Sequence, residues 1–125
     1  MDAHTVAKNY LAHLEKGDME AVIGLFSANG LVQSPLYGLQ KAKTFYTLLA
    51  KDTQASKLVL KGIFNEHQGQ RIVILFTYHW TLKSGVQISF EVVDILTLNT
   101  ALQIEKLTIV YDTEQTRKHI SFAGL

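Results

Sequence analysis

An acidic residue in the middle of an apolar stretch is the strongest chemical signal in this sequence. Asp94 lies within Val86–Leu98, whose residues alternate between two faces in the pattern of a β-strand. Apart from Asp94, the even-numbered face is apolar: Val86, Ile88, Phe90, Val92, Leu96 and Leu98. A carboxylate on a buried apolar face must be paired, be protonated or lie beside a wet cavity, because an isolated buried charge is costly. Desolvation favours the neutral acid, which can donate a hydrogen bond or act as a general acid. The alternative is a structural carboxylate, satisfied by a helix terminus or a neighbouring hydroxyl.

A histidine on the preceding strand is a second candidate. The strand predicted over residues 71–83 is joined to the Asp94 strand by a tight turn at residues 84–85. With a two- or four-residue loop, His79 and Thr77 share the face of Asp94. An imidazole titrates near neutral pH, so His79 can then serve as a base beside Asp94; the alternative is a packing residue. A three-residue loop would reverse the parity and place both residues on the opposite face.

The elements that position these residues follow from hydrophobic periodicity. Helical stripes predict a helix from about Ala3 to Lys16, a second helix after the N-cap Asp18 that fades past Phe26, and a third from about Gln40 to Ala50. A short extended segment at residues 31–34 precedes the single proline, Pro35. Long strands are predicted over residues 57–65, 71–83, 86–98 and 102–112, and no structure is predicted for the tail from Thr113. Three helices followed by a meander of antiparallel strands form an α+β domain.

Composition narrows the function classes. The 125 residues are 47% apolar with a formal net charge of +1, which predicts one globular domain over residues 1–125 (core about 3–113) and no nucleic-acid surface. The absence of cysteine excludes disulfides, thiolate metal sites and thiol nucleophiles. No apolar run is long enough to span a bilayer and the N-terminus does not resemble a signal peptide, so we expect no membrane partner and a cytoplasmic location. We expect no cofactor and no metal, since the Asp94 face offers at most two ligands.

Five segments resemble the NTF2-like superfamily, and within it the SnoaL-like and ketosteroid-isomerase-like proteins. The segments are Tyr-Leu-Ala-His-Leu-Glu-Lys-Gly-Asp-Met-Glu-Ala from Tyr10, Val-Gln-Ser-Pro-Leu-Tyr-Gly from Val32, Phe-Tyr from Phe45, Phe-Glu-Val-Val-Asp-Ile-Leu from Phe90, and Ile-Glu-Lys-Leu-Thr-Ile-Val-Tyr-Asp from Ile104. The resemblance implies an NTF2-like (cystatin-like) cone, in which three N-terminal helices pack on a strongly curved mixed or antiparallel sheet. It also implies an apolar pocket open at one end, and usually a homodimer.

The resemblance also implies roles for individual residues. Ketosteroid isomerases hold the substrate carbonyl with a tyrosine on the first helix and a protonated aspartic acid on the penultimate strand, positions that match Tyr10 and Asp94. Their general base is an aspartate just before the loop proline, where this sequence has Ser34. Steroid-type isomerisation therefore lacks its base here. The alternative for Ser34 is a structural role, in which its hydroxyl caps backbone groups of the loop. An aromatic pocket residue on their last strand is matched by Tyr111.

Two functions of different class remain open. The first is a small enzyme with isomerase-, cyclase- or lyase-like acid/base chemistry on an apolar, carbonyl-bearing metabolite. Its catalytic residues would be Asp94, Tyr10 and His79. The second is a non-catalytic ligand-binding or dimerisation module with the same fold. In both, the ligand is a small apolar molecule, and the expected wall residues are Ser34, Phe45, Thr77, Phe90, Leu107, Ile109 and Tyr111. An apolar face of the sheet is expected to meet a partner subunit in a homodimer.

Overall fold

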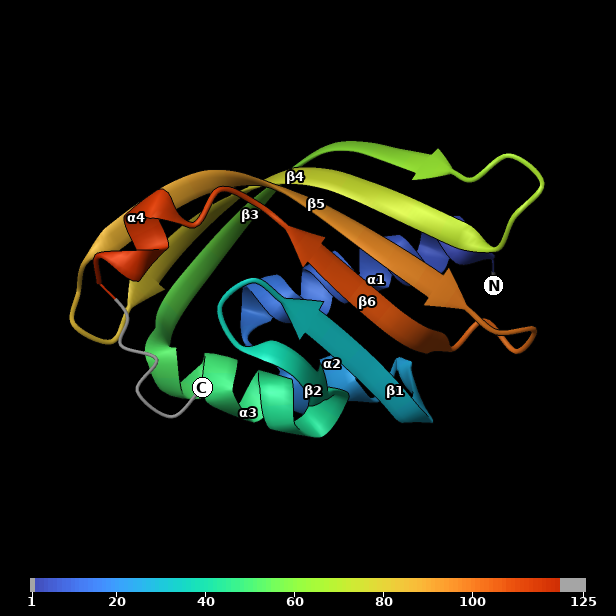
Figure 1. The fold of residues 1–125 in the computed structure, drawn as a ribbon, viewed down its shortest axis with the longest axis horizontal. Helices are drawn as coiled ribbons and strands as arrows, with labels where there is room; N and C mark the ends of the chain where they lie inside the picture. The colour runs from blue at the N-terminus through green and yellow to red at the C-terminus, as the bar shows by residue number, and fades with distance from the viewer. Residues whose placement is uncertain (1, 120–125) are drawn as a thin grey trace.

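A curved sheet with helices on one side forms the body of the protein (Figure 1). The structure is a computed structural model and describes residues 2–119. The helices are α1 (Ala3–Lys16), α2 (Met19–Ile23), α3 (Ala42–Asp52) and α4 (Glu114–Arg117). The strands are β1 (Phe26–Ser34), β2 (Gly38–Lys41), β3 (Thr53–Asn65), β4 (Arg71–Leu82), β5 (Gln87–Leu98) and β6 (Ile104–Val110). They form one mixed sheet in the order β2-β1-β6-β5-β4-β3, in which β1 and β6 are parallel and the other neighbours antiparallel. The α+β class and the curved mixed sheet expected from the sequence are confirmed.

The first helix begins and ends where the sequence predicts. The Asp2 carboxylate accepts a hydrogen bond from the Thr5 amide at 2.8 Å, and Gly17 ends the helix in the left-handed conformation at φ 74°. Asp18 caps α2 in the same way, through the Ala21 amide. The prediction that this second helix continues past Phe26 is wrong. Phe26 starts β1 instead, because it pairs with Ile104 of β6 and so joins the sheet.

The turn between β4 and β5 decides which side chains share a face with Asp94. The Leu82 amide donates to the Val86 carbonyl at 2.9 Å, so the loop has three residues and its last, Gly85, takes a φ of 89°. Ile74 therefore lies opposite Asp94, and β4 presents its even-numbered residues to the helices. The register expected from a two- or four-residue loop is wrong by one residue.

The helix-facing side of the sheet carries the core. On β5 the even-numbered face is buried as predicted, with Ile88, Val92, Leu96 and Leu98 each less than a tenth exposed. The opposite, outer side of the sheet is also rich in apolar side chains. Among the described residues, no helix is long and apolar enough to cross a membrane.

The C-terminal segment has structure that the sequence did not predict. After β6 the chain forms α4, whose Thr116 is fully buried. The Arg117 guanidinium donates to the Pro35 carbonyl at 3.1 Å, which ties this segment to the loop after β1. Residues 120–125 of the predicted unstructured tail lie outside the described residues.

Candidate functional site

A small cavity lies between the helices and the inner face of the sheet, with a volume of about 40 Å³. This is room for one or a few water molecules. Seven of the ten residues predicted for the site line this cavity: Tyr10, Ser34, Phe45, Phe90, Asp94, Ile109 and Tyr111. Aromatic side chains that the sequence did not point to, among them Phe76, Tyr78 and Trp80 of β4, complete much of the wall. They were missed because the expected register put them on the other face of the sheet.

Among the described residues, Asp94 is the one Asp, Glu, Lys, Arg or His side chain in the wall of this cavity. Its side chain is 2% exposed, and its Oδ1 atom has no hydrogen-bond partner within residues 2–119. Burial raises the pKa of the Asp94 carboxyl well above its ordinary value. Burial therefore favours the neutral carboxylic acid over the carboxylate. A neutral acid beside a cavity has an O–H to donate and an oxygen left to accept.

A pair of tyrosines supports the same end of the cavity. The Tyr10 and Tyr46 hydroxyls, from α1 and α3, lie 2.6 Å apart, and both side chains are at most 1% exposed. Burial raises the pKa of Tyr10 well above its ordinary value, and the neighbouring Tyr46 and Asp94 raise it further. Because Tyr46 satisfies one side of the Tyr10 hydroxyl, this hydroxyl is oriented. The sequence placed Tyr46 on the apolar stripe of its helix, and nothing in the pattern indicated the pairing.

The Ser34 hydroxyl caps backbone amides, which is the structural role weighed for it above. It accepts hydrogen bonds from the amides of Leu36 at 3.1 Å and of Tyr37 at 3.3 Å, which fixes the turn around Pro35. Within the described residues no histidine or carboxylate contacts this hydroxyl. Ser34 therefore shapes the cavity wall and is not activated as a nucleophile or base.

Three further tyrosines, Tyr37, Tyr78 and Tyr111, line the cavity. Tyr37 donates a short hydrogen bond to Asp52, the last residue of α3. The Tyr78 hydroxyl lies 2.9 Å from Ser56 Oγ, and its pKa is raised to about 12, chiefly by burial. Tyr111 stacks on Phe90 with ring centroids 4.3 Å apart. The wall thus combines hydrogen-bonded phenols with stacked rings.

Three predicted site residues lie elsewhere. His79 and Thr77 are on the outer face of the sheet, since β4 pairs them with Ser89 and Glu91 of β5. His79 is exposed and its Nδ1 lies 2.6 Å from Ser89 Oγ. Its expected position beside Asp94 is wrong, because the three-residue turn shifts the register of β4 by one residue. Leu107 faces the helices but is fully buried in the core outside the cavity wall. Among residues 2–119, no group of three His, Asp or Glu side chains could hold a metal ion.

Solved structures with the same arrangement of elements were found by comparison. An NTF2-like protein of unknown function from Burkholderia pseudomallei K96243 matches with a TM-score of 0.82 and 14% identity, over 97% of this chain and 99% of that chain. The fold is NTF2-like. Similar structures include SalBIII, an epoxide hydrolase/cyclase-like enzyme with a role in pyran ring formation in the polyether salinomycin (TM-score 0.77, 12% identity, 88% of this chain and 90% of that chain). A protein from Catenulispora acidiphila DSM 44928 with a ketosteroid isomerase-like fold, in complex with trimethylamine, matches with a TM-score of 0.75 and 12% identity, over 86% of this chain and 85% of that chain. No family model and no curated protein matches the sequence.

The NTF2-like fold accounts for the relation between the two residues that the sequence resemblance singled out. Tyr10 and Asp94 are far apart in the sequence, on α1 and β5, yet both line the cavity. Asp94 also raises the pKa of Tyr10, which places the two groups within electrostatic range of each other. A phenol and a carboxyl group, each able to donate a hydrogen bond, thus belong to the wall of one cavity.

Proposed function

We propose that this NTF2-like protein binds a small apolar molecule with a carbonyl group and catalyses an acid/base reaction on it, as an isomerase, cyclase or lyase does. Asp94 donates its proton or a hydrogen bond to the carbonyl oxygen, and Tyr10 is a second donor. The observation that carries the proposal is the buried Oδ1 of Asp94, which no group of residues 2–119 satisfies. A buried polar atom without a partner costs free energy, and a ligand atom can supply the missing partner.

In the reaction, the donors act on charge that develops at the carbonyl oxygen. When a C–H bond next to the carbonyl is broken, its electron pair moves toward the oxygen and forms an enol or enolate. Neutral donors in a site without bulk water stabilise this oxygen more strongly than the ground-state carbonyl. The aromatic wall provides contact area for a flat, apolar substrate body.

The size of the cavity sets a condition on binding. The cavity of about 40 Å³ has room for a few water molecules, so we expect a ligand with an aromatic body to displace them and to shift wall side chains. The stacked pair Phe90 and Tyr111 is only partly buried and is the part of the wall that we expect to move. The similarity to SalBIII, described as epoxide hydrolase/cyclase-like, supports acid/base chemistry in a cavity of this fold.

The experiment uses acetophenone, a flat aromatic methyl ketone, as the probe. Proton NMR in D₂O follows the exchange of its methyl protons, which requires an enol or enolate. We expect the protein to accelerate the exchange and the Asp94→Asn variant to lose about 100-fold or more of this acceleration. The Asp112→Asn variant is the matched control, because this exposed carboxylate accepts the Glu114 amide at 3.0 Å, which asparagine can also do. Full activity of Asp94→Asn, or no acceleration by the unmodified protein, contradicts the proposal.

A second candidate function is a ligand-binding module without catalysis. Its specific support is Ser34, which stands where the ketosteroid isomerases have their base and whose hydroxyl is engaged by two backbone amides. Chemical-shift changes of cavity residues on adding acetophenone, without any acceleration of exchange, would favour this candidate over the enzyme.

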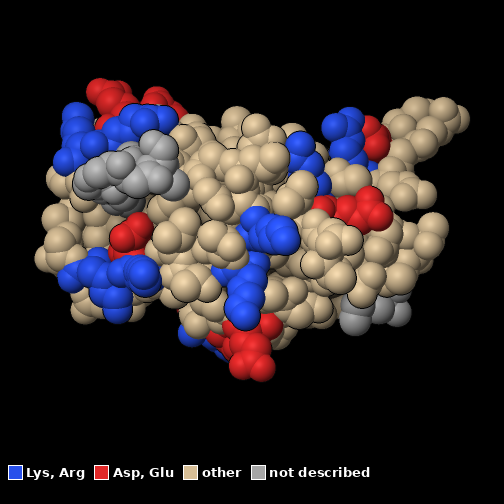
Figure 2. Space-filling model, turned by 60° about the horizontal axis from the view of Figure 1, so that its bottom comes forward, with Lys and Arg blue, Asp and Glu red and all other residues tan. Residues whose placement is uncertain are grey.

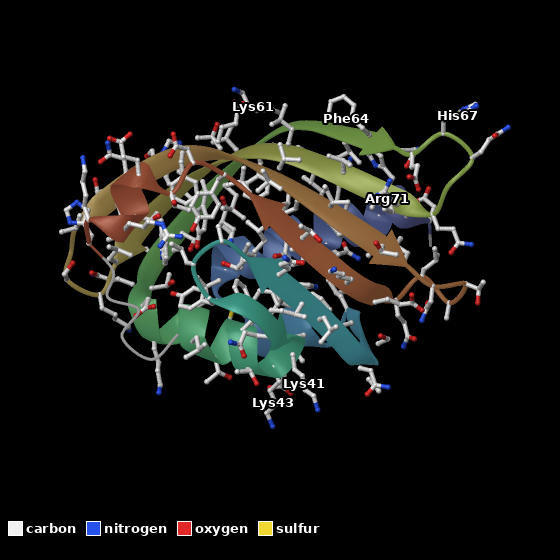
Figure 3. All side chains as sticks on the ribbon, viewed as in Figure 1. Lys41, Lys43, Lys61, Phe64, His67 and Arg71 are labelled. Carbon is white, nitrogen blue, oxygen red and sulfur yellow. The ribbon has the colours of Figure 1, made fainter. Side chains whose placement is uncertain are left out.

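We also propose that the protein is a homodimer through the outer face of the sheet. Cross-strand pairing puts seven apolar side chains on that face: Val59, Phe64, Val73, Leu75, Val93, Ile95 and Val110. Phe64 and Val110 are each more than half exposed, and Figure 3 shows Phe64 pointing away from the helices. Such an apolar patch marks an interaction surface. Figure 2, which shows another face, has Lys and Arg interspersed with Asp and Glu among mostly neutral residues.

Light scattering after gel filtration tests the dimer. Val110→Lys should shift the protein from dimer to monomer, because the charge would be buried at the interface. Leu60→Lys is the matched control, since Leu60 is 42% exposed but pairs with Phe76 on the helix side of the sheet. A monomeric unmodified protein, or a Val110→Lys variant that remains a dimer, contradicts this interface.

A further inference from the structure

A tyrosine and a carboxylate form a second acid/base pair at the cavity. Tyr37 lines the cavity, is 5% exposed, and donates a short hydrogen bond from its hydroxyl to Oδ2 of Asp52. Asp52 is half-buried and is not among the residues of the cavity wall. Within the described residues, its carboxylate therefore connects to the cavity through the Tyr37 phenol. The function described above requires a proton acceptor, and Ser34 does not provide one.

The carboxylate of this pair stands at an electrostatically unfavourable place. Asp52 is the last residue of α3, where the helix dipole presents its negative end and normally favours a cation. The carboxylate at this position accepts the Tyr37 hydroxyl, and this hydrogen bond connects it to the cavity wall.

Neighbouring contacts hold both members of the pair in place. The Tyr37 ring packs edge-on against Phe45, with centroids 5.5 Å apart and an interplanar angle of 83°. The Asp52 carbonyl accepts the Lys83 amide at 3.1 Å, which links the end of α3 to the β4–β5 turn. Next to Asp52, the Thr53 hydroxyl donates to the chain one helical turn back and accepts the Trp80 indole N–H at 2.8 Å. A pair fixed from these sides is preorganised for proton transfer.

We propose that Tyr37, backed by Asp52, is the proton acceptor of the reaction, in place of the loop aspartate that this sequence lacks. The proposal rests on the acid/base function described above. In the forward step the C–H bond next to the substrate carbonyl breaks, and its electron pair forms the enol double bond as Asp94 donates to the carbonyl oxygen. The substrate proton goes to Tyr37 Oη while the Tyr37 proton passes to Asp52 Oδ2. The reverse transfer returns a proton to the same or another carbon, so the protein ends unchanged.

The electrostatics of Tyr37 explain why two residues are needed. Burial, followed by the hydrogen bond and the charge of Asp52, raises the pKa of the Tyr37 phenol. The phenol is therefore protonated at neutral pH and can accept a proton only if it gives up its own. Asp52 is the group to which it gives that proton. Removing either the phenol hydroxyl or the carboxylate breaks the relay.

The acetophenone exchange assay tests the pair with two variants. Tyr37→Phe keeps the ring and its contact with Phe45 but removes the hydroxyl, and Asp52→Asn keeps the shape but removes the proton acceptor. We expect each to lower the exchange rate at saturating acetophenone by about 100-fold or more, the range for loss of a general base. The acetophenone concentration at half-saturation should change by less than about threefold, because the carbonyl contacts remain. If the pair is purely structural, both variants should instead bind acetophenone more weakly and melt at a lower temperature, and the loss should not be confined to the exchange rate at saturation.

The outcomes separate this inference from the function on which it rests. If both variants exchange acetophenone as fast as the unmodified protein while Asp94→Asn does not, the pair is not the proton acceptor and the function stands. If the unmodified protein gives no exchange above buffer, the function fails and the inference fails with it. Equal loss in the control Asp112→Asn, an exposed residue outside the cavity wall, would also overturn the inference by attributing the effect to the loss of a negative charge in general.

Discussion

The buried acid Asp94 makes the stability of the protein depend on pH in a way that a single substitution should remove. The carboxyl is 2% exposed and its pKa is raised by burial, whereas an unfolded chain has the ordinary value of 3.8. Between these two pKa values the native state keeps a proton that the unfolded state releases. The free energy of unfolding therefore falls as pH rises through this window, by about 1.4 kcal/mol per pH unit. The loss continues until the pH reaches the raised pKa of native Asp94.

The Asp94→Asn variant has nearly the same shape and no titration. Its stability relative to the unmodified protein should therefore rise with pH above pH 5, by up to about 1.4 kcal/mol per pH unit. Urea unfolding at pH 5, 6 and 7, followed by the fluorescence of the single tryptophan, Trp80, measures both proteins at each pH. Other titrating groups cancel in the difference. The Asp112→Asn variant, which removes a carboxylate at an exposed site, is the matched control.

The refuting result is a constant difference between Asp94→Asn and the unmodified protein from pH 5 to pH 7. That result would mean that Asp94 is already ionised at pH 5 in the native state, as a paired or solvated carboxylate is. The neutral donor on which the proposed chemistry depends would then be absent.

Three further predictions follow from buried contacts. Tyr46→Phe should lower the free energy of unfolding by about 1–3 kcal/mol, because it leaves the buried Tyr10 hydroxyl without its partner at 2.6 Å. In urea unfolding, the double variant with Tyr10→Phe should lose less stability than the sum of the two single variants. Gly30→Ala should lower stability by about 1–3 kcal/mol in the same assay, since its new Cβ would lie 2.8 Å from a buried aromatic ring and 3.0 Å from a backbone carbonyl of β6. Gly62→Ala meets a ring at the same 2.8 Å, but this ring belongs to Phe64, which is 55% exposed and can rotate away, so we expect a melting temperature within a few degrees of the unmodified protein. Equal effects of the two glycine substitutions, or additive tyrosine effects, would contradict these assignments.

Much of the fold is local and was therefore determined by the sequence. The α1 boundaries depend on Asp2 and Gly17, whose effects act within one helical turn. The buried face of β5, with Asp94 in its middle, depends only on a period of two. Neither feature depends on which distant segment packs against it.

The tertiary structure decided what these elements bring together. Whether His79 or Tyr78 faces Asp94 depended on one residue in the β4–β5 turn, because a shift by one reverses every side chain of a strand. Phe26 belongs to a strand and not to a helix because β6, nearly eighty positions later, pairs with it. The pairs Tyr10–Tyr46 and Tyr37–Asp52 join residues from separate segments, and hydrophobic periodicity does not predict which side chains of separate segments make contact. The sequence by itself determined a buried acid, and only the tertiary structure decided its neighbours, since hydrogen-bond geometry is fixed by the packing of distant segments.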